Sequence, residues 1–81
     1  ENPVDKPVAQ GNKQAQALSS VQGLIDAGKF NEALIEAQKA ARKFPTSGEA
    51  YYLLGLAQGY LDQGEAAQQS FTKARELGFT P

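Results

Sequence analysis

The sequence predicts an all-α domain built from two helix–turn–helix hairpins, which place four antiparallel helices in succession. Three observations support this prediction. From residue 13 onward the composition is dominated by Ala, Gln, Leu, Glu and Lys, which are good helix formers. Glycine and proline divide that stretch into four pieces of helical length. No segment shows the apolar–polar alternation with β-branched residues that is typical of a strand.

The first twelve residues differ from the rest of the chain. Pro3 and Pro7 disfavour helix at the residue before each of them, and Gly11-Asn12 is a turn signal. We therefore expect residues 1–12 to form a disordered or extended N-terminal arm. The alternative is that this arm docks as a short peptide through its two valines.

The first two helices are delimited by glycine, asparagine and proline. The first runs from about Lys13 to Ala27, because Gly28 is a helix-ending residue. The second follows Asn31, a preferred N-cap residue, and ends at Phe44-Pro45.

Two further signals mark the second helix. Phe30 before the cap and Ile35 after it have the spacing of a hydrophobic staple. Positive charge in the last turns suits the negative end of the helix dipole, and this is how we interpret the one basic cluster, Lys39, Arg42 and Lys43.

The third and fourth helices complete the second hairpin. The third opens with the capping-box spacing of Thr46 and Glu49 and runs to about Asp62. The fourth begins near Glu65, whose charge suits a helix N-terminus, and ends at Gly78.

The two hairpins repeat with a fixed period. Ala33 and Ala40 of the second helix recur as Ala67 and Ala74 of the fourth, and the interval is the same for both pairs. A period of about 34 residues in helix–turn–helix units is a property of tetratricopeptide repeats.

The second hairpin also resembles the tetratricopeptide family in its residue pattern, with Tyr51-x2-Leu54-Gly55 followed by Ala67-x3-Phe71-x2-Ala74. The resemblance implies a short right-handed α-solenoid in residues 13–81, with repeat one at about 14–47 and repeat two at about 48–81. Gly64 stands two residues later than the period from Gly28 predicts, so the geometry of the second turn does not follow from the first.

Composition excludes several classes of function. A net charge of −1 argues against nucleic acid, and no apolar stretch is long enough to span a membrane. The chain has no His and no Cys, its acidic residues are scattered, and no phosphate-binding glycine loop occurs. We therefore expect no enzyme activity, no metal site and no cofactor.

The third helix is the informative anomaly, because Ala50–Ala57 are all apolar or small. A helix that is apolar all round is buried all round. In tetratricopeptide arrays the first helix of each repeat lines a concave groove that holds a partner. By this resemblance the predicted groove consists of Leu18, Ser19, Gln22, Ile25, Tyr52, Leu53, Leu56, Gly59 and Tyr60. The alternative is that Tyr52, Leu53 and Leu56 pack against the first repeat.

The expected function is a protein–protein interaction scaffold that binds an apolar or amphipathic segment of a partner, as an extended peptide or a helix. Family members that bind acidic chaperone tails use Lys, Arg and Asn in this groove, which has none here, so we expect no such binding. The alternative is a self-association module. The end with Phe71, Leu77 and Phe79 would then be covered by another copy, unless the chain is a fragment of a longer array. A chain without an initiator Met fits such a fragment or an exported protein, for example of a bacterial envelope.

Overall fold

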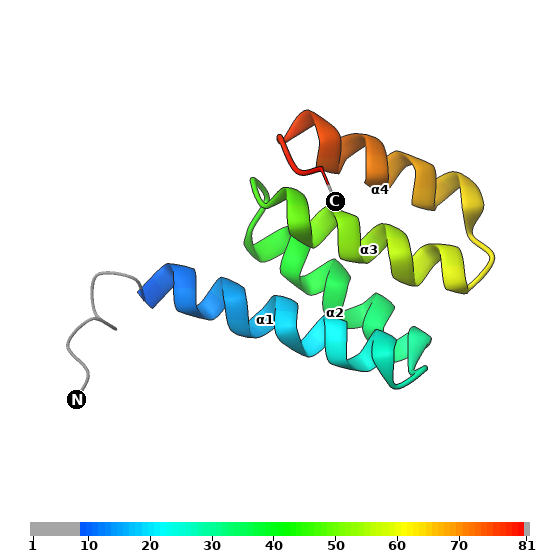
Figure 1. Ribbon diagram of the computed structural model, residues 1–81, viewed down its shortest axis with the longest axis horizontal. Helices are drawn as coiled ribbons and strands as arrows, with labels where there is room; N and C mark the ends of the chain where they lie inside the picture. Colours follow the sequence, from blue (N-terminus) through cyan, green and yellow to red (C-terminus); the bar gives the residue numbers. More distant parts are fainter. Residues whose placement is uncertain (1–8, 81) are drawn as a thin grey trace.

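The chain folds into four helices arranged as two hairpins (Figure 1). The computed structural model describes residues 9–80, with side chains from residue 13 onward. Helices α1 and α3 run in one direction and α2 and α4 run in the other, and the described residues contain no strand. The predicted all-α fold of helical hairpins is therefore confirmed, with helices at α1 (Ala9–Asp26), α2 (Phe30–Lys43), α3 (Gly48–Tyr60) and α4 (Gly64–Glu76).

Helix α1 begins earlier than the sequence indicated. It starts at Ala9, so Gly11-Asn12 lies inside a helix and is not a turn. One glycine costs a helix about 1 kcal/mol relative to alanine, which the residues on both sides can offset. The remainder of the predicted arm, residues 1–8 with Val4 and Val8, lies outside the described residues.

The predicted start of α2 is also wrong. The helix begins at Phe30, directly after Lys29, which provides no side-chain cap, and Asn31 lies within the first turn. The hydrophobic staple does not form, because Ile35 is 52% exposed and Phe30 stacks on the ring of Tyr60 instead.

The basic residues of α2 lie where the sequence placed them. Arg42 and Lys43 are in the last turn. Lys39 pairs with Glu36 one turn earlier, with 3.5 Å between Nζ and Oε2. Because both side chains are well exposed, this pair contributes little to stability.

Helix α3 is capped one residue later than predicted. Ser47, not Thr46, is the N-cap, and its Oγ accepts a hydrogen bond from the backbone N–H of Ala50 at 3.1 Å. Gln14 of α1 donates to the same Oγ at 3.3 Å. The cap therefore also ties the second hairpin to the first.

The two hairpin turns are equivalent, although their sequences differ. Gly28 has a φ of 80°, and Asp62, which stands one repeat period later, has a φ of 63°. The residue after each turn donates its backbone N–H to the carbonyl five residues earlier, at 2.8 Å in both hairpins. Aspartate tolerates the left-handed region better than most residues, so Asp62 can take the part that glycine has in the first turn.

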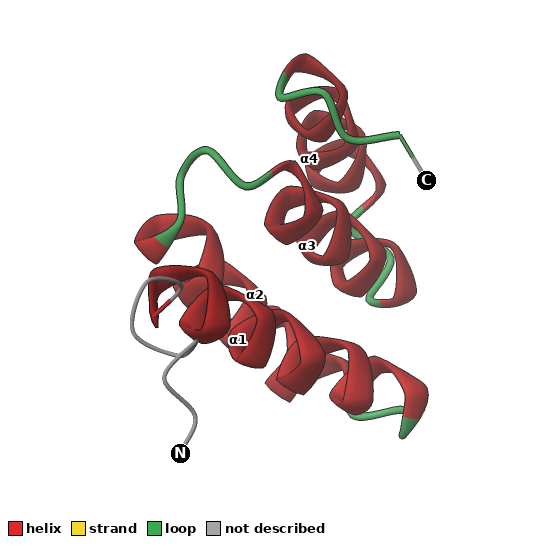
Figure 2. Ribbon diagram, turned by 60° about the vertical axis from the view of Figure 1, so that its left-hand side comes forward, coloured by secondary structure: helices red, strands yellow, loops and turns green. Residues whose placement is uncertain are grey.

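The core lies where the two hairpins stack (Figure 2). Helix α3 packs against both α1 and α2, and its Leu53 is only 2% exposed. On its other side α3 contacts α4, where the ring of Phe71 covers Gly55 and Ser70 Oγ donates to Gln58 Oε1 at 2.7 Å. Contact on two sides explains why α3 has no polar face.

Candidate functional site

The predicted groove is divided by the packing of α1 against α3. Leu18 and Ile25 of α1 and Leu53 of α3 are 5%, 7% and 2% exposed and belong to the core. These three side chains fill the contact between the helices, so they do not form a free surface. The alternative of packing against the first repeat therefore holds for Leu53, while Tyr52 and Leu56 are half-buried and pack against the edge of the same core.

The polar members of the predicted groove remain on the surface of α1. Ser19 and Gln22 are exposed, and Gln22 Nε2 donates to Asp26 Oδ1 at 3.1 Å on the same helix. The first hairpin therefore contributes mainly polar groups here. The apolar members that stay accessible all come from α3.

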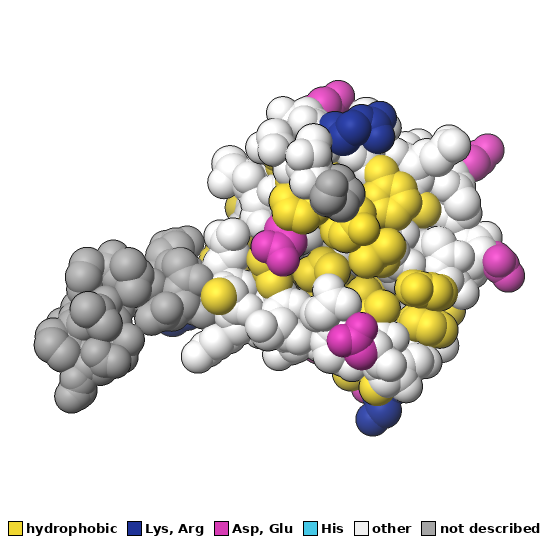
Figure 3. Space-filling model, viewed as in Figure 1, with side chains coloured by type: hydrophobic (Ala, Val, Ile, Leu, Met, Phe, Trp, Pro, Cys, Tyr) yellow, Lys and Arg dark blue, Asp and Glu magenta, His cyan; other side chains and the backbone are white. Residues whose placement is uncertain are grey.

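Apolar side chains gather on one face of the molecule, over α3 and between α3 and α4 (Figure 3). Four predicted residues contribute: Tyr52 and Leu56 are half-buried, and Gly59 and Tyr60 are exposed. Phenylalanines from three other places in the chain extend this face. We refer to it as the aromatic surface, formed by Phe30, Tyr52, Leu56, Tyr60, Phe71 and Phe79.

Phe30 and Tyr60 form one end of the aromatic surface. Their rings are nearly parallel, with centroids 4.3 Å apart and an interplanar angle of 8°. Tyr60 is nevertheless 57% exposed. Stacking on one side fixes the ring of Tyr60 while much of it stays available, and a fixed aromatic ring loses little entropy when it binds a partner.

Tyr52 lies at the other end, between two phenylalanine rings. Its centroid is 5.6 Å from that of Phe71 and 5.2 Å from that of Phe79. Phe79 reaches this position because the chain turns back after Gly78, which has a φ of 90°, and packs against the start of α3 at Gly48.

Two apolar recesses adjoin Phe71 and form what we call the α3–α4 cleft. One, of about 210 Å³, is lined by Tyr52, Phe71, Ala74, Arg75 and Phe79. The other, of about 230 Å³, is lined by Gly55, Leu56, Gly59, Tyr60 and Phe71. Arg75 is the one charged residue in either lining.

The two glycines of this cleft have different surroundings. A Cβ atom at Gly55 would lie 2.6 Å from Cε1 of Phe71, whereas a Cβ atom at Gly59 would meet nothing within 4 Å. Gly55 allows Phe71 to approach α3. Gly59 leaves an open notch beside Leu56 and Tyr60.

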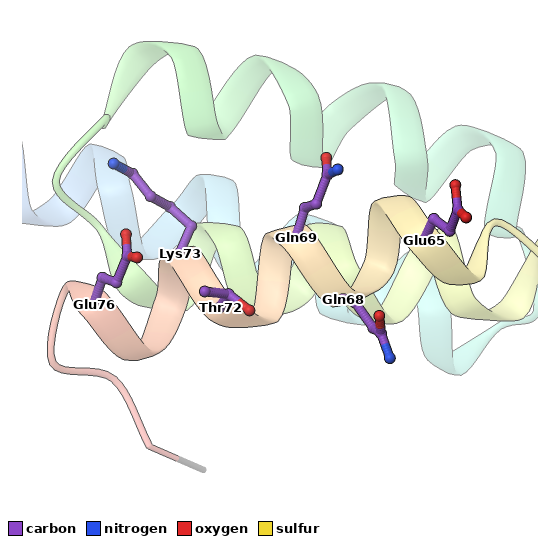
Figure 4. A pocket seen from close by; sticks show the side chains of 6 residues that line it. All are labelled: Glu65, Gln68, Gln69, Thr72, Lys73 and Glu76. Atoms are coloured by element: carbon purple, nitrogen blue, oxygen red, sulfur yellow. The ribbon is translucent and has the colours of Figure 1, made fainter.

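A different recess on the outer side of α4 is polar (Figure 4). All of its side chains come from this single helix, and Gln68 and Gln69 point to opposite sides of it. The side chains that line it are Glu65, Gln68, Gln69, Thr72, Lys73 and Glu76. They do not converge on a common point, so we assign this recess no chemistry.

Two kinds of feature are absent from the residues that the structure describes. Within residues 9–80, no helix combines the length and apolarity needed to cross a bilayer. In the same part of the chain, no group of three or more Asp and Glu side chains is arranged to hold a metal ion.

Comparisons with protein-family models, curated proteins and solved structures found no match to this chain. The tetratricopeptide resemblance is therefore a proposal that rests on the repeat period and the motif of the second hairpin.

The predicted groove does not include Phe30, Phe71 and Phe79, although the sequence predicts Phe71 and Phe79 at an apolar end that another copy could cover. The repeat period contains the signal for Phe71, because it stands one period after Ala37, which is completely buried. Ala37 is covered by the second hairpin, whereas no further hairpin of the described residues covers Phe71 at the equivalent position. No sequence signal indicated the stacking of Phe30 on Tyr60.

Proposed function

We propose that this chain is a protein-interaction module whose aromatic surface binds an apolar or amphipathic segment of a partner protein. The observation that supports the proposal is a contiguous apolar face on which five half-buried large side chains lie beside the exposed Tyr60 (Figure 3). Contiguous exposed apolar patches on small proteins tend to mark interaction sites.

The composition of the aromatic surface also favours binding. Aromatic residues provide large contact areas and are enriched at the centres of interfaces. The rings of Tyr52 and Tyr60 are positioned by neighbouring rings in the free protein. The mechanism would be burial of apolar partner groups on this preformed surface, with tyrosine hydroxyls fixing the orientation.

A selection from a display library of random peptides of about 16 residues, long enough for about four helical turns, tests this proposal. The library is selected against the whole chain, and the recovered peptides are measured by calorimetry. We expect apolar peptides whose affinity falls about tenfold or more with Leu56→Glu, because a charge would lie in the centre of the contact.

Ile35→Glu is the matched control, because Ile35 is an exposed aliphatic residue outside the aromatic surface. It should leave the peptide affinity unchanged. Peptides that bind wild type and Leu56→Glu equally well would show that the binding surface lies elsewhere. Failure to recover any peptide would also count against the proposal.

Self-association is the second candidate. The projecting Tyr60 and the notch at Gly59 are neighbours, so the surface contains both a projection and a recess that another copy could match. Light scattering over a wide concentration range tests it. A dimer that Leu56→Glu converts to a monomer would favour this candidate over a separate partner.

A further inference from the structure

In the first hairpin, the edge that faces the second hairpin is covered by a helix. Helix α3 packs against α1 and α2 there and buries the residues at this edge. Leu18, Val21 and Ala37 are at most 5% exposed there. The occupant of this first edge is an α-helix that runs parallel to α1 (Figure 1).

The second hairpin has the same edge, and it is open. The residues one repeat period later are Tyr52, Gly55 and Phe71. They line the two recesses of the α3–α4 cleft, and Tyr52 and Phe71 are only half-buried. No helix of the described residues lies over this cleft.

The cleft has room for an additional side chain beside Gly59. Gly59 stands one repeat period after Ile25, a core residue that is 7% exposed. An open glycine in place of that isoleucine leaves a notch between Leu56, Tyr60 and Phe71. A large apolar side chain of an incoming helix would fill it.

The charge of the cleft restricts the incoming helix further. Arg75 lies at the end of the cleft near Phe79, and its one described side-chain hydrogen bond is a donation to Thr72 Oγ1 at 3.5 Å. Among the described residues, no carboxylate lies within ion-pair distance of it. A carboxylate on the occupant would complement this single cation.

The geometry points to an amphipathic α-helix of a partner protein as the occupant of the α3–α4 cleft, an inference that rests on the proposed function. The helix runs parallel to α3, as α3 runs parallel to α1. It inserts a large apolar side chain into the notch at Gly59 and places an Asp or Glu of its first turn near Arg75. That position also suits the positive end of its own dipole.

The peptides recovered from the display library, which imposes no conformation, test the inference. We expect their apolar residues at helical spacing (i, i+3, i+4, i+7), an acidic residue near the N-terminal end, and a gain of helical circular dichroism on binding. Gly59→Leu fills the notch and should weaken binding about tenfold or more. Arg75→Gln should reduce the preference for acidic peptides.

Gly23→Leu is the matched control, because Gly23 is also a helical glycine with nothing within 4 Å of an added Cβ. Both substitutions place a better helix former in a helix, so the fold is retained. Gly23→Leu should bind the peptides as wild type does.

Three results would overturn the inference. Recovered peptides could be proline-rich or extended. Peptides could lose affinity with Leu56→Glu but not with Gly59→Leu, in which case the proposed function stands and the helix in the cleft does not. Light scattering could detect a dimer that Gly59→Leu abolishes, which would make a second copy the occupant.

Discussion

At the scale of single residues, Gly55 and Gly59 show how the same residue type has two uses one turn apart. Both lie in α3, and in both cases alanine would be the better helix former by about 1 kcal/mol. Gly55 is needed because the ring of Phe71 occupies the space of a side chain. Gly59 has no such neighbour within the described residues, so the fold does not require it.

This contrast gives a prediction for a pair of variants. Gly59→Ala should raise the free energy of unfolding by about 0.5–1 kcal/mol, through helix propensity alone. Gly55→Ala should be at least about 1 kcal/mol less stable than Gly59→Ala, because the new methyl group forces Phe71 away from α3. Urea unfolding followed by circular dichroism measures both values. Equal stabilisation by the two alanines would show that Phe71 moves away without cost.

Asp62 also belongs to this scale. The sequence left the second turn undetermined, because Gly64 does not match the position of Gly28. The structure places Asp62 in the left-handed conformation at the position equivalent to Gly28 in the repeat. The position of the turn thus follows the repeat period of the flanking helices. The residue at position 62 needs only to tolerate a positive φ.

At the scale of the elements, the number and order of the helices could be predicted, while several of their ends could not. Gly28, Pro45 and Gly78 lie at the helix breaks, where glycine and proline commonly stand, whereas Gly11, Gly23, Gly55 and Gly59 lie inside helices. An N-cap residue needs a particular backbone conformation, and the sequence contains adjacent residues that could each serve as the cap. Thr46 and Ser47 are adjacent, and only the structure distinguishes Ser47 as the cap of α3.

The capping role of Ser47 can be measured. Ser47→Ala should lower the free energy of unfolding by about 1–2 kcal/mol, because the N–H of Ala50 loses its acceptor and Gln14 loses its partner. Ser20→Ala, on an exposed helical position of α1, is the control and should change stability little. If Thr46→Ala were as destabilising as Ser47→Ala, the assigned cap would be wrong.

The part of the candidate site that the sequence could predict lies entirely in α3. The apolar stretch of α3 indicated contact on all sides, and Tyr52, Leu56, Gly59 and Tyr60 are accessible. Helical periodicity identifies the apolar residues of α1, but it does not show whether each one contacts solvent, a partner or α3. Leu18 and Ile25 are buried against α3, and the sequence does not give the distance between these two helices that makes this burial possible.

At the scale of the whole molecule, the core joins the two hairpins. Its members come from α1, α2 and α3, and Leu53 of the second hairpin is among the most buried side chains. Because this one cluster is built from both hairpins, neither hairpin has a large apolar interior of its own. We therefore expect the two hairpins to fold and unfold as one cooperative unit.

Leu53→Ala tests this expectation. It should lower the free energy of unfolding by about 2–5 kcal/mol, a large fraction of the about 5–15 kcal/mol typical of a domain. Ile35→Ala, which truncates an aliphatic side chain that is 52% exposed, should have a much smaller effect.

All three tyrosines are in α3 and the chain has no Trp, so tyrosine fluorescence reports the second hairpin while far-ultraviolet circular dichroism reports both. The two transitions should coincide in wild type and shift together in Leu53→Ala. Separate transitions would show that each hairpin is stable alone, and that the contact of α3 with the first hairpin contributes little to the fold.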